Sequence, residues 1–393
     1  MTRPGRHARF HAEPGAEDAP QAAVVRGRGA LSNRSGRYES WSRSDVDDGW
    51  GSLDASLDEI ENAATTLQVD SSRRVISRNE SPDVPFDRSI NPYRGCEHGC
   101  IYCYARPTHA WLGLSPGRDF ETKLFYKPDA VELLRRELGA RGYRPSPIAL
   151  GANTDPYQPV ERRLRLTRGI LELLRECSHP AMIATKSVLI DRDAELLEAM
   201  ASKALVNVAV SVTTLDDELS RRMEPRAAGP RQRLATVERL SRRGIPVSVL
   251  VAPIIPGLTD HEIESILRAA RSAGARDAAY VMLRLPLEIA GLFHEWLDAQ
   301  YPLRAARVRS LVRQTAGGRD YRGGFGTRMR GTGQIAELIA NRFEKCRRRL
   351  GFAGRPELDS SRFRPPATAP SADPRAAARK RAAEAAGQLG LPI

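Results

Sequence analysis

The sequence predicts an α/β protein built on a parallel sheet. Between residues 147 and 283, short apolar runs rich in Val, Ile and Ala alternate with longer segments in which apolar residues recur at helical spacing. Such alternation is typical of repeated strand–helix units with right-handed crossovers. The chain of 393 residues can hold two domains or one α/β barrel. Periodicity alone does not choose between a partly closed barrel and an open sheet.

The predicted elements follow one another in regular order. Six strands are expected, the first near residue 89 and the others at 147–151, 182–185, 206–212, 247–252 and 279–283. Helical spacing predicts helices at 129–138, 166–176, 192–200, 231–242 and 261–273, and an amphipathic helix at 335–348.

Composition changes along the chain and predicts its division. Residues 1–80 are rich in Gly, Arg, Ser and acids, which predicts a largely disordered basic extension, and 353–393 form a second disordered tail rich in Pro, Ala and Arg. Between them we expect a core over 81–300 and a basic Gly/Arg loop with a helix over 301–352. Five cysteines without a paired framework, no signal peptide and no long apolar run indicate a cytoplasmic protein that does not enter a membrane.

The stretch RGCEHGCIYCYARP places Cys96, Cys100 and Cys103 within eight residues. Thiolates favour zinc or iron–sulfur clusters, and Gly95 and Gly99 allow the backbone to wrap around one centre. A closed zinc site or a fully ligated cubane needs four protein ligands, so three thiols leave one coordination position open. The alternative is a zinc knuckle completed by His98 or by a distant residue.

Polar side chains follow several predicted strands, where ligands bind in parallel α/β folds. Asn153, Thr154 and Asp155 form a loop suited to ribose hydroxyls or a cationic amine, although such a loop also caps helices. Lys186 ends a buried strand and needs a carboxylate partner. Ser211 lies within a strand, where serine is often a small core residue, and Ala252 ends another strand.

Two further stretches carry charge that suits anionic ligands. From Arg304 to Arg349 there are 13 cations against three acids, which is a candidate footprint for nucleic acid, or a solvated surface. Within it, the loop at 317–333 mixes glycine, arginine and aromatics and could stack bases, or simply join two elements. Glu224 and Arg226 could hold a substrate carboxylate or phosphate, or form a surface ion pair.

The cysteine triad, with Tyr102 before its last cysteine, resembles the signature of the radical S-adenosylmethionine (SAM) superfamily. The wider run SPDVPFDRSINPYRGCEHGCIYCYARPTHA resembles the spore photoproduct lyase-like branch, and within it a group of bacterial proteins of unassigned substrate. The likeness covers roughly residues 26–350 and includes an N-terminal RGRGALSN element. It implies a partial (β/α)6 barrel, which periodicity alone left open.

The resemblance also implies a chemistry. Cys96, Cys100 and Cys103 would hold a 4Fe-4S cluster that cleaves SAM reductively to a 5′-deoxyadenosyl radical, with electrons from a flavodoxin- or ferredoxin-type donor. Positions matching the family's SAM pocket are Tyr102, Thr154, Lys186, Ser211 and Ala252, to which the loop residues Asn153 and Asp155 are added here.

One position departs from the family's DNA-repair members. They carry a hydrogen-donating cysteine where this chain has Asn153, so spore photoproduct repair is not expected, although Tyr104 keeps the neighbouring aromatic and is the candidate catalytic residue. The competing hypothesis is a non-enzymatic nucleic-acid-binding protein with a structural zinc or iron–sulfur knot.

Overall fold

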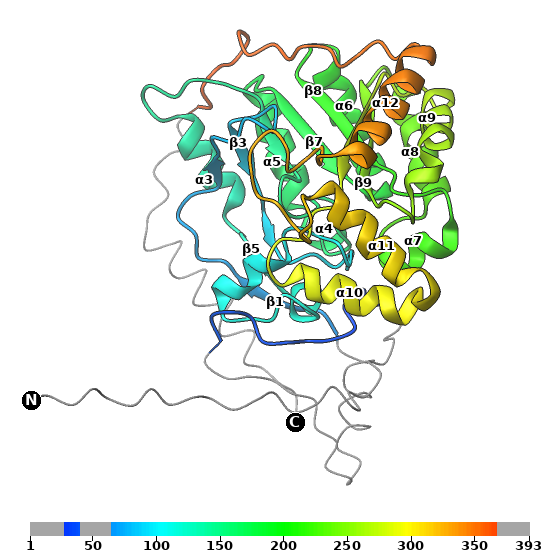
Figure 1. Ribbon diagram of the computed structural model, residues 1–393. Helices are drawn as coiled ribbons and strands as arrows, with labels where there is room; N and C mark the ends of the chain where they lie inside the picture. The colour runs from blue at the N-terminus through cyan, green and yellow to red at the C-terminus, as the bar shows by residue number, and fades with distance from the viewer. Residues whose placement is uncertain (1–26, 40–63, 368–393) are drawn as a thin grey trace, which may run out of the picture.

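A seven-stranded sheet forms the centre of the molecule (Figure 1). The computed structural model describes residues 27–39 and 64–367. Six neighbouring strands are parallel, as predicted, and an antiparallel strand is added at one edge. In spatial order the strands are β10 (Asp277–Met282), β9 (Val247–Ile254), β8 (Val206–Ser211), β7 (Ala181–Thr185), β6 (Ile148–Leu150), β3 (Arg88–Ile90) and β2 (Ile76–Arg78).

Helices cover the outer face of this sheet, and each lies between consecutive strands as the alternation predicted (Figure 1). They are α3 (Ala130–Leu138), α5 (Leu166–Glu176), α6 (Ala194–Ala201), α8 (Pro230–Arg242) and α9 (Ile263–Ser272). The predicted C-terminal helix is α12 (Gln334–Arg349), which packs on α9. Two helices that the sequence analysis did not predict precede it, α10 (Ile289–Gln300) and α11 (Pro302–Thr315).

The two faces of the sheet carry different side chains. On the outer face, Ile183, Val210 and Val249 are at most 1% exposed and form the core with the helices. On the inner face, ladder pairing brings Ala184 beside Ala209, and both stay partly exposed. The hydrophobic core lies on the outer face, so the inner face does not need large packed side chains. Its small residues leave space for a ligand.

The sheet does not close on itself within the described residues, because β10 and β2 pair with no further strand. The loop at 317–333, golden in Figure 1, spans the resulting seam. The Met282 N–H of β10 donates to the Met329 carbonyl at 2.9 Å. Three residues earlier, the Gly326 N–H donates to Asp83, in the connection between β2 and β3, at 2.6 Å. This open, bridged sheet fits the partial (β/α)6 barrel expected from the resemblance.

Both predicted extensions contain ordered parts. Residues 1–26, 40–63 and 368–393 lie outside the described residues. Within the N-terminal range, β1 (Thr66–Val69) joins a small sheet with β5 (Lys123–Tyr126) and β4 (Tyr93–Arg94).

The C-terminal segment at 353–367 crosses the amino ends of the strands, over the top of Figure 1. There Gly354 N–H donates to Arg276 and Arg364 N–H donates to Cys177, at 3.1 and 2.9 Å. This described part of the predicted tail is ordered because backbone hydrogen bonds hold it against the sheet. No helix among the described residues is long and apolar enough to cross a bilayer.

Candidate active site

The cysteine loop begins directly after β4 and turns back under the sheet. Gly95 and Gly99 have φ of 78° and 67°, a left-handed conformation that glycine accepts without strain. Cys96 and Cys100 are buried and Cys103 is partly exposed. Burial raises the pKa of all three thiols, and the charge on Asp155 and on the other two cysteines raises that of Cys96 further. Such thiols stay protonated unless a strongly positive centre, such as a bound metal, stabilises the thiolate.

His98, the candidate fourth ligand of a zinc knuckle, faces another residue. Its Nδ1 lies 3.3 Å from the Asp155 carboxylate, and both side chains are buried. Among the described residues, no three or more His, Cys, Asp and Glu side chains, the three cysteines included, are grouped closely enough for one metal ion, whose ligands must lie closer together than thiolates that bind separate irons of a cluster. The observed role of His98 is thus to pair with Asp155.

A buried ion pair supports the cysteine loop from below. Arg106 is fully buried and donates to the carbonyl oxygens of Cys100 and Gly99, at 2.9 and 3.0 Å. Its guanidinium also pairs with Glu121 at 2.5 Å. The guanidinium has five N–H donors in a fixed plane, so it holds these carbonyls in one geometry. The sequence analysis missed this pair, although Arg106 stands only three residues after the last cysteine of the triad.

The N-terminal RGRGALSN element is docked on the same loop (dark blue at the base of Figure 1). Both oxygens of Glu121 accept backbone N–H groups from it, Gly29 at 3.0 Å and Ala30 at 2.9 Å. Asn33 and Asp119 exchange two hydrogen bonds of 3.0 Å. This segment, residues 27–39, therefore fixes the cysteine loop from a second side.

We expect Gly29→Ala to displace the N-terminal segment from the cysteine loop. A Cβ at this position would lie 1.8 Å from the carbonyl oxygen of Gly99, a distance at which one backbone must move. Overpacking of this kind costs about 1–3 kcal/mol. Urea unfolding, together with the iron content after reconstitution, measures the effect. The control is Gly291→Ala in α10, where nothing lies within 4 Å of the new Cβ and the free energy of unfolding should rise by about 0.5–1 kcal/mol. Equal stability of the two variants would contradict the expectation.

A second buried network joins residues predicted for the SAM pocket. Glu224 accepts hydrogen bonds from Tyr102, from Thr213 at 2.8 Å and from Arg233. The Arg233 guanidinium also donates to the Ser211 carbonyl at 3.1 Å. The Thr213 hydroxyl also lies 3.1 Å from the Ala252 carbonyl, so its single proton has two acceptors within reach. Three predicted pocket residues, from three separate segments, thus meet at one place.

Glu224 and Arg226 do not act together in this structure. Glu224 is 1% exposed and is fully engaged with Arg233 and Tyr102. Arg226 instead lies 3.4 Å from Glu97, with its side chain 35% exposed. Glu224 is therefore a buried anchor for the end of β8, whereas Arg226 forms its ion pair with Glu97 and not with Glu224.

Asp155 connects the loop after β6 to the end of β7. Its carboxylate accepts hydrogen bonds from the Thr185 hydroxyl and from the backbone N–H of Lys186, both at 2.7 Å. Burial raises the pKa of Asp155, but the neighbouring His98 and these hydrogen bonds outweigh it and lower the pKa to about 2. Asp155 is therefore an anion that positions Lys186. Beside it, the Thr154 hydroxyl donates to the Tyr93 carbonyl at 3.0 Å.

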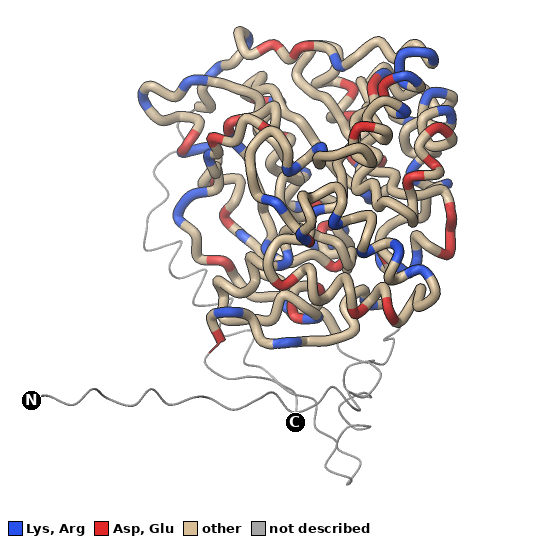
Figure 2. The backbone as a smooth tube through the Cα atoms, in the orientation of Figure 1, with Lys and Arg blue, Asp and Glu red and all other residues tan. Residues whose placement is uncertain are grey.

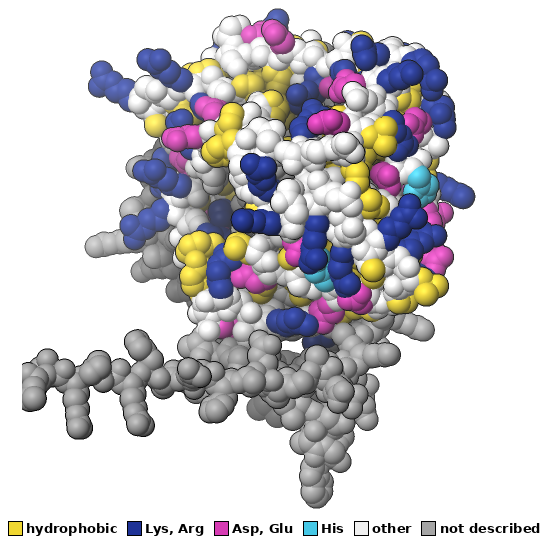
Figure 3. Space-filling view, viewed as in Figure 1, with side chains coloured by type: hydrophobic (Ala, Val, Ile, Leu, Met, Phe, Trp, Pro, Cys, Tyr) yellow, Lys and Arg dark blue, Asp and Glu magenta, His cyan; other side chains and the backbone are white. Residues whose placement is uncertain are grey.

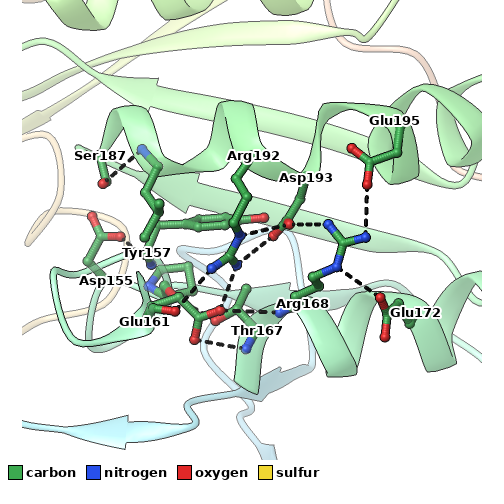
Figure 4. A network of polar contacts seen from close by, with 12 residues as sticks. Asp155, Tyr157, Glu161, Thr167, Arg168, Glu172, Ser187, Arg192, Asp193 and Glu195 are labelled. Carbon is green, nitrogen blue, oxygen red and sulfur yellow. Dashed lines mark hydrogen bonds and ion pairs between the residues drawn. The ribbon is translucent and has the colours of Figure 1, made fainter. Parts of the chain in front are cut away.

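Behind this loop lies a network of buried charges (Figure 4). Glu161 and Asp193 are both 0% exposed, and Arg192 bridges them at 2.8 and 2.9 Å. Arg168 adds a second contact to Asp193 at 2.8 Å. Glu161 also accepts the Thr167 N–H at 3.1 Å. The polar groups satisfy one another, so this network anchors the segment that carries Asp155.

The other predicted residues lie around the same edge of the sheet. Lys186 Nζ lies 5.8 Å from the centre of the Tyr102 ring. Tyr104 is 43% exposed, and its hydroxyl donates to the Ala152 carbonyl. The next backbone N–H, that of Asn153, donates to the Asn91 side chain at 3.0 Å. All the predicted site residues are thus collected at the cysteine loop and the carboxyl ends of the strands.

The basic block of Arg304 to Arg349 is divided between α11, the loop at 317–333 and α12, and part of it is structural. Figure 2 marks the positions of Lys and Arg along the backbone, and Figure 3 shows cationic side chains over much of the visible face, with acidic ones between them. Five cations of the block form ion pairs with acids, namely Arg309, Arg313, Arg328, Arg342 and Arg347.

The amino-acid sequence is similar to those of known proteins. The family model of the radical SAM superfamily matches residues 90–270. An uncharacterised protein of Mycobacterium tuberculosis is 39% identical over 233 residues, which cover 59% of this chain and 68% of the relative. An uncharacterised protein of Methanocaldococcus jannaschii is 26% identical over 213 residues, 54% of this chain and 76% of the relative. The chain belongs to the radical SAM superfamily.

Solved structures show the same superfamily fold. A singly substituted variant of spore photoproduct lyase has a TM-score of 0.51 at 16% identity, covering 74% of this chain and 82% of the lyase chain. A doubly substituted variant with bound AdoMet and dinucleoside spore photoproduct has a TM-score of 0.50 at 15% identity, with the same coverage. The recognition and the fold expected from the sequence are confirmed, and the chain is a radical SAM enzyme. The non-enzymatic alternative is not supported.

Radical SAM enzymes use a 4Fe-4S cluster and SAM and need a reductant. The donor set of this chain fits such a cluster. The cysteine loop offers three thiols, and the remaining cysteines, Cys177 and Cys346, are buried in the core among apolar residues of the helices. If these three thiolates held the cluster, one iron would have no cysteine ligand from the chain and could bind SAM.

Proposed function

We propose that Cys96, Cys100 and Cys103 ligate the 4Fe-4S cluster, and that the chain uses it to generate a radical that abstracts hydrogen from a substrate. When bound, the cluster and SAM supply one-electron cleavage of the sulfonium, which yields methionine and a 5′-deoxyadenosyl radical. The observation that supports the proposal is the cysteine loop itself, which offers three thiols and whose Gly99 and Cys100 carbonyls are bound by the buried Arg106 of the Arg106–Glu121 pair. The buried pair keeps the loop in a single geometry before the cluster is bound.

The surrounding residues then position SAM. Lys186 is the cation best placed for the SAM carboxylate, since Asp155 holds its backbone and Tyr102 lies under its amine. Asn153 offers an amide to the ribose from the loop after β6, and the buried Thr154, whose hydroxyl donates to the Tyr93 carbonyl, holds this loop in place. Ser211 and Ala252 are small enough to let the adenosyl group approach the inner face of β8 and β9. Tyr104 is partly exposed beside Cys103 and is the proposed residue on the substrate side.

Two segments support the exclusion of solvent from the proposed site. The N-terminal segment covers the cysteine loop, and the loop at 317–333 covers the seam of the sheet. A radical intermediate needs such cover because water and oxygen would quench it. We propose that a flavodoxin- or ferredoxin-type protein supplies the electron.

Nucleic acid is the substrate class that we place first. Cations of the basic block that form no ion pair in the described residues include Arg319 and Arg322, on the loop beside the seam. The spore photoproduct lyase variant, which has a similar fold, binds a dinucleoside spore photoproduct, and this supports a nucleic-acid substrate here. We expect a product other than that of spore photoproduct repair, because the amide of Asn153 cannot return a hydrogen atom to a substrate radical as a cysteine can. Binding to DNA or RNA that is absent even at low salt would remove nucleic acid from consideration.

Anaerobic reconstitution tests the proposed function. The full chain is supplied with iron and sulfide, reduced with dithionite and incubated with SAM. We expect about four irons per chain and formation of 5′-deoxyadenosine that depends on the reductant. Zinc as the bound metal, or no product from a reduced and reconstituted sample, would overturn the proposal.

A further inference from the structure

Arg284 follows β10 at the carboxyl edge of the sheet and has no acidic partner. It is partly buried, and its Nε is shielded from solvent without any hydrogen-bond acceptor. The one side-chain contact of its Nη1 is the Met329 sulfur at 3.3 Å, a weak acceptor. No carboxylate in the described parts of the chain forms an ion pair with it. Asp83, whose charge reaches Arg284, is held instead by Gly326 and Arg328.

Three buried arginines of this protein, unlike Arg284, form ion pairs with a carboxylate. Arg106 is paired with Glu121, Arg233 with Glu224 and Arg88 with Asp87. A guanidinium carries five donors and cannot lose its charge, so removing it from water without an anion is costly. Arg284 therefore lacks the carboxylate partner that Arg106, Arg233 and Arg88 have, although its Nε is equally cut off from water.

Arg284 lies beside the candidate active site, so a ligand bound there could supply the anion that Arg284 lacks. Its guanidinium carbon is 5.1 Å from the centre of the Tyr104 ring. Tyr104 follows Cys103 and spans from the cysteine loop to Ala152, at the end of β6. Arg284 and Lys186 thus stand over two tyrosines on either side of Cys103. If Lys186 takes the carboxylate of SAM, a second anion is needed for Arg284.

We propose that Arg284 binds an oxyanion of the substrate, a phosphate or a carboxylate, with the Tyr104 ring as the platform under its guanidinium. The proposal rests on the proposed function, because it places the substrate at the same site. The planar guanidinium of arginine can donate two parallel hydrogen bonds to either anion. The substrate is then an anionic molecule whose charged group lies at the carboxyl end of β10.

Anion binding to the full-length chain tests this without cluster or reductant. Calorimetric titration uses inorganic phosphate in one arm and acetate in the other, with chloride at matched ionic strength as the blank. The variants are Arg284→Gln, which removes the charge, and Arg284→Lys, which keeps the charge but loses the fork. The matched control is Arg330→Gln, since Arg330 also stacks on a ring, 4.4 Å from the centre of Tyr280, but on the outer face where Tyr280 packs against Phe343.

We expect the parent chain and Arg330→Gln to bind at least one of the two anions equally well. Arg284→Gln should weaken that binding by about ten- to a hundredfold, and Arg284→Lys by less, because charge-assisted hydrogen bonds are lost in full or in part. Binding of phosphate only, acetate only or both assigns the anion. No binding by the parent chain, or binding that survives in Arg284→Gln, would overturn the proposal. Because these titrations omit SAM, their failure is distinct from a failure to form 5′-deoxyadenosine.

Discussion

Replacing Cys96, Cys100 and Cys103 together with alanine reduces 5′-deoxyadenosine formation to the level of the reaction without reductant. The three thiols are the only cysteines of the loop, and the rest of the described chain offers no further thiol beside them. Without them no iron can be held at the site, so the iron content after reconstitution falls from about four per chain to near zero. Iron analysis and product quantification on the same sample measure both effects.

The remaining two cysteines provide the matched control. Cys177→Ala and Cys346→Ala remove buried thiols from the helical core, at a typical cost of about 1 kcal/mol each. Both variants should keep the iron content and the product yield of the parent chain. A triple variant of the loop that still holds four irons would show that other residues ligate the cluster.

Replacing Arg106 with methionine should lower the free energy of unfolding by about 3–5 kcal/mol, the usual cost of leaving one partner of a buried ion pair alone. Glu121 would keep a buried charge, and the carbonyl oxygens of Gly99, Cys100 and Gly117 would each lose a donor. The urea midpoint measures the loss at constant m-value. Iron content should fall as well, because the cysteine loop loses its support.

A surface pair of the same chemistry serves as the control for Arg106. Arg242 and Glu238 form an ion pair one helical turn apart on α8, and their side chains are 76% and 46% exposed. Arg242→Met should change stability by no more than about 0.5 kcal/mol. The double variant Arg106→Met with Glu121→Gln tests the pairing itself, since it should be less destabilised than the sum of the two single variants. Strict additivity would mean that the two side chains do not act as a pair.

The sequence predicted the six parallel strands and the helices between them because their periodicity is local. It also predicted the cysteine loop, since three thiols within eight residues are visible without a structure. It missed α11, whose buried residues Ala305, Val308 and Val312 form a narrow stripe on a helix rich in arginine. A helix with so narrow an apolar stripe gives a weak periodic signal.

Contacts between distant positions could not be predicted from the sequence. Glu121 bonds to Gly29, 92 residues away, and no local pattern marks that partnership. The same reason explains the ordered N-terminal segment. Its composition of Gly, Arg, Ser and Asn predicts disorder because little apolar surface can be buried. The structure orders it through hydrogen bonds to Glu121 and Asp119 instead, which composition does not reveal.

The bridge between Asp83 and the loop at 317–333 makes one boundary of the sheet different from the others. Neighbouring strands are joined by ladders of backbone hydrogen bonds, whereas this boundary depends on a few contacts from Gly326, Arg328 and Met329. Separating two paired strands would break a whole ladder, but parting this boundary breaks only those few bonds. This boundary is therefore the place where the sheet can part at the least cost to the fold.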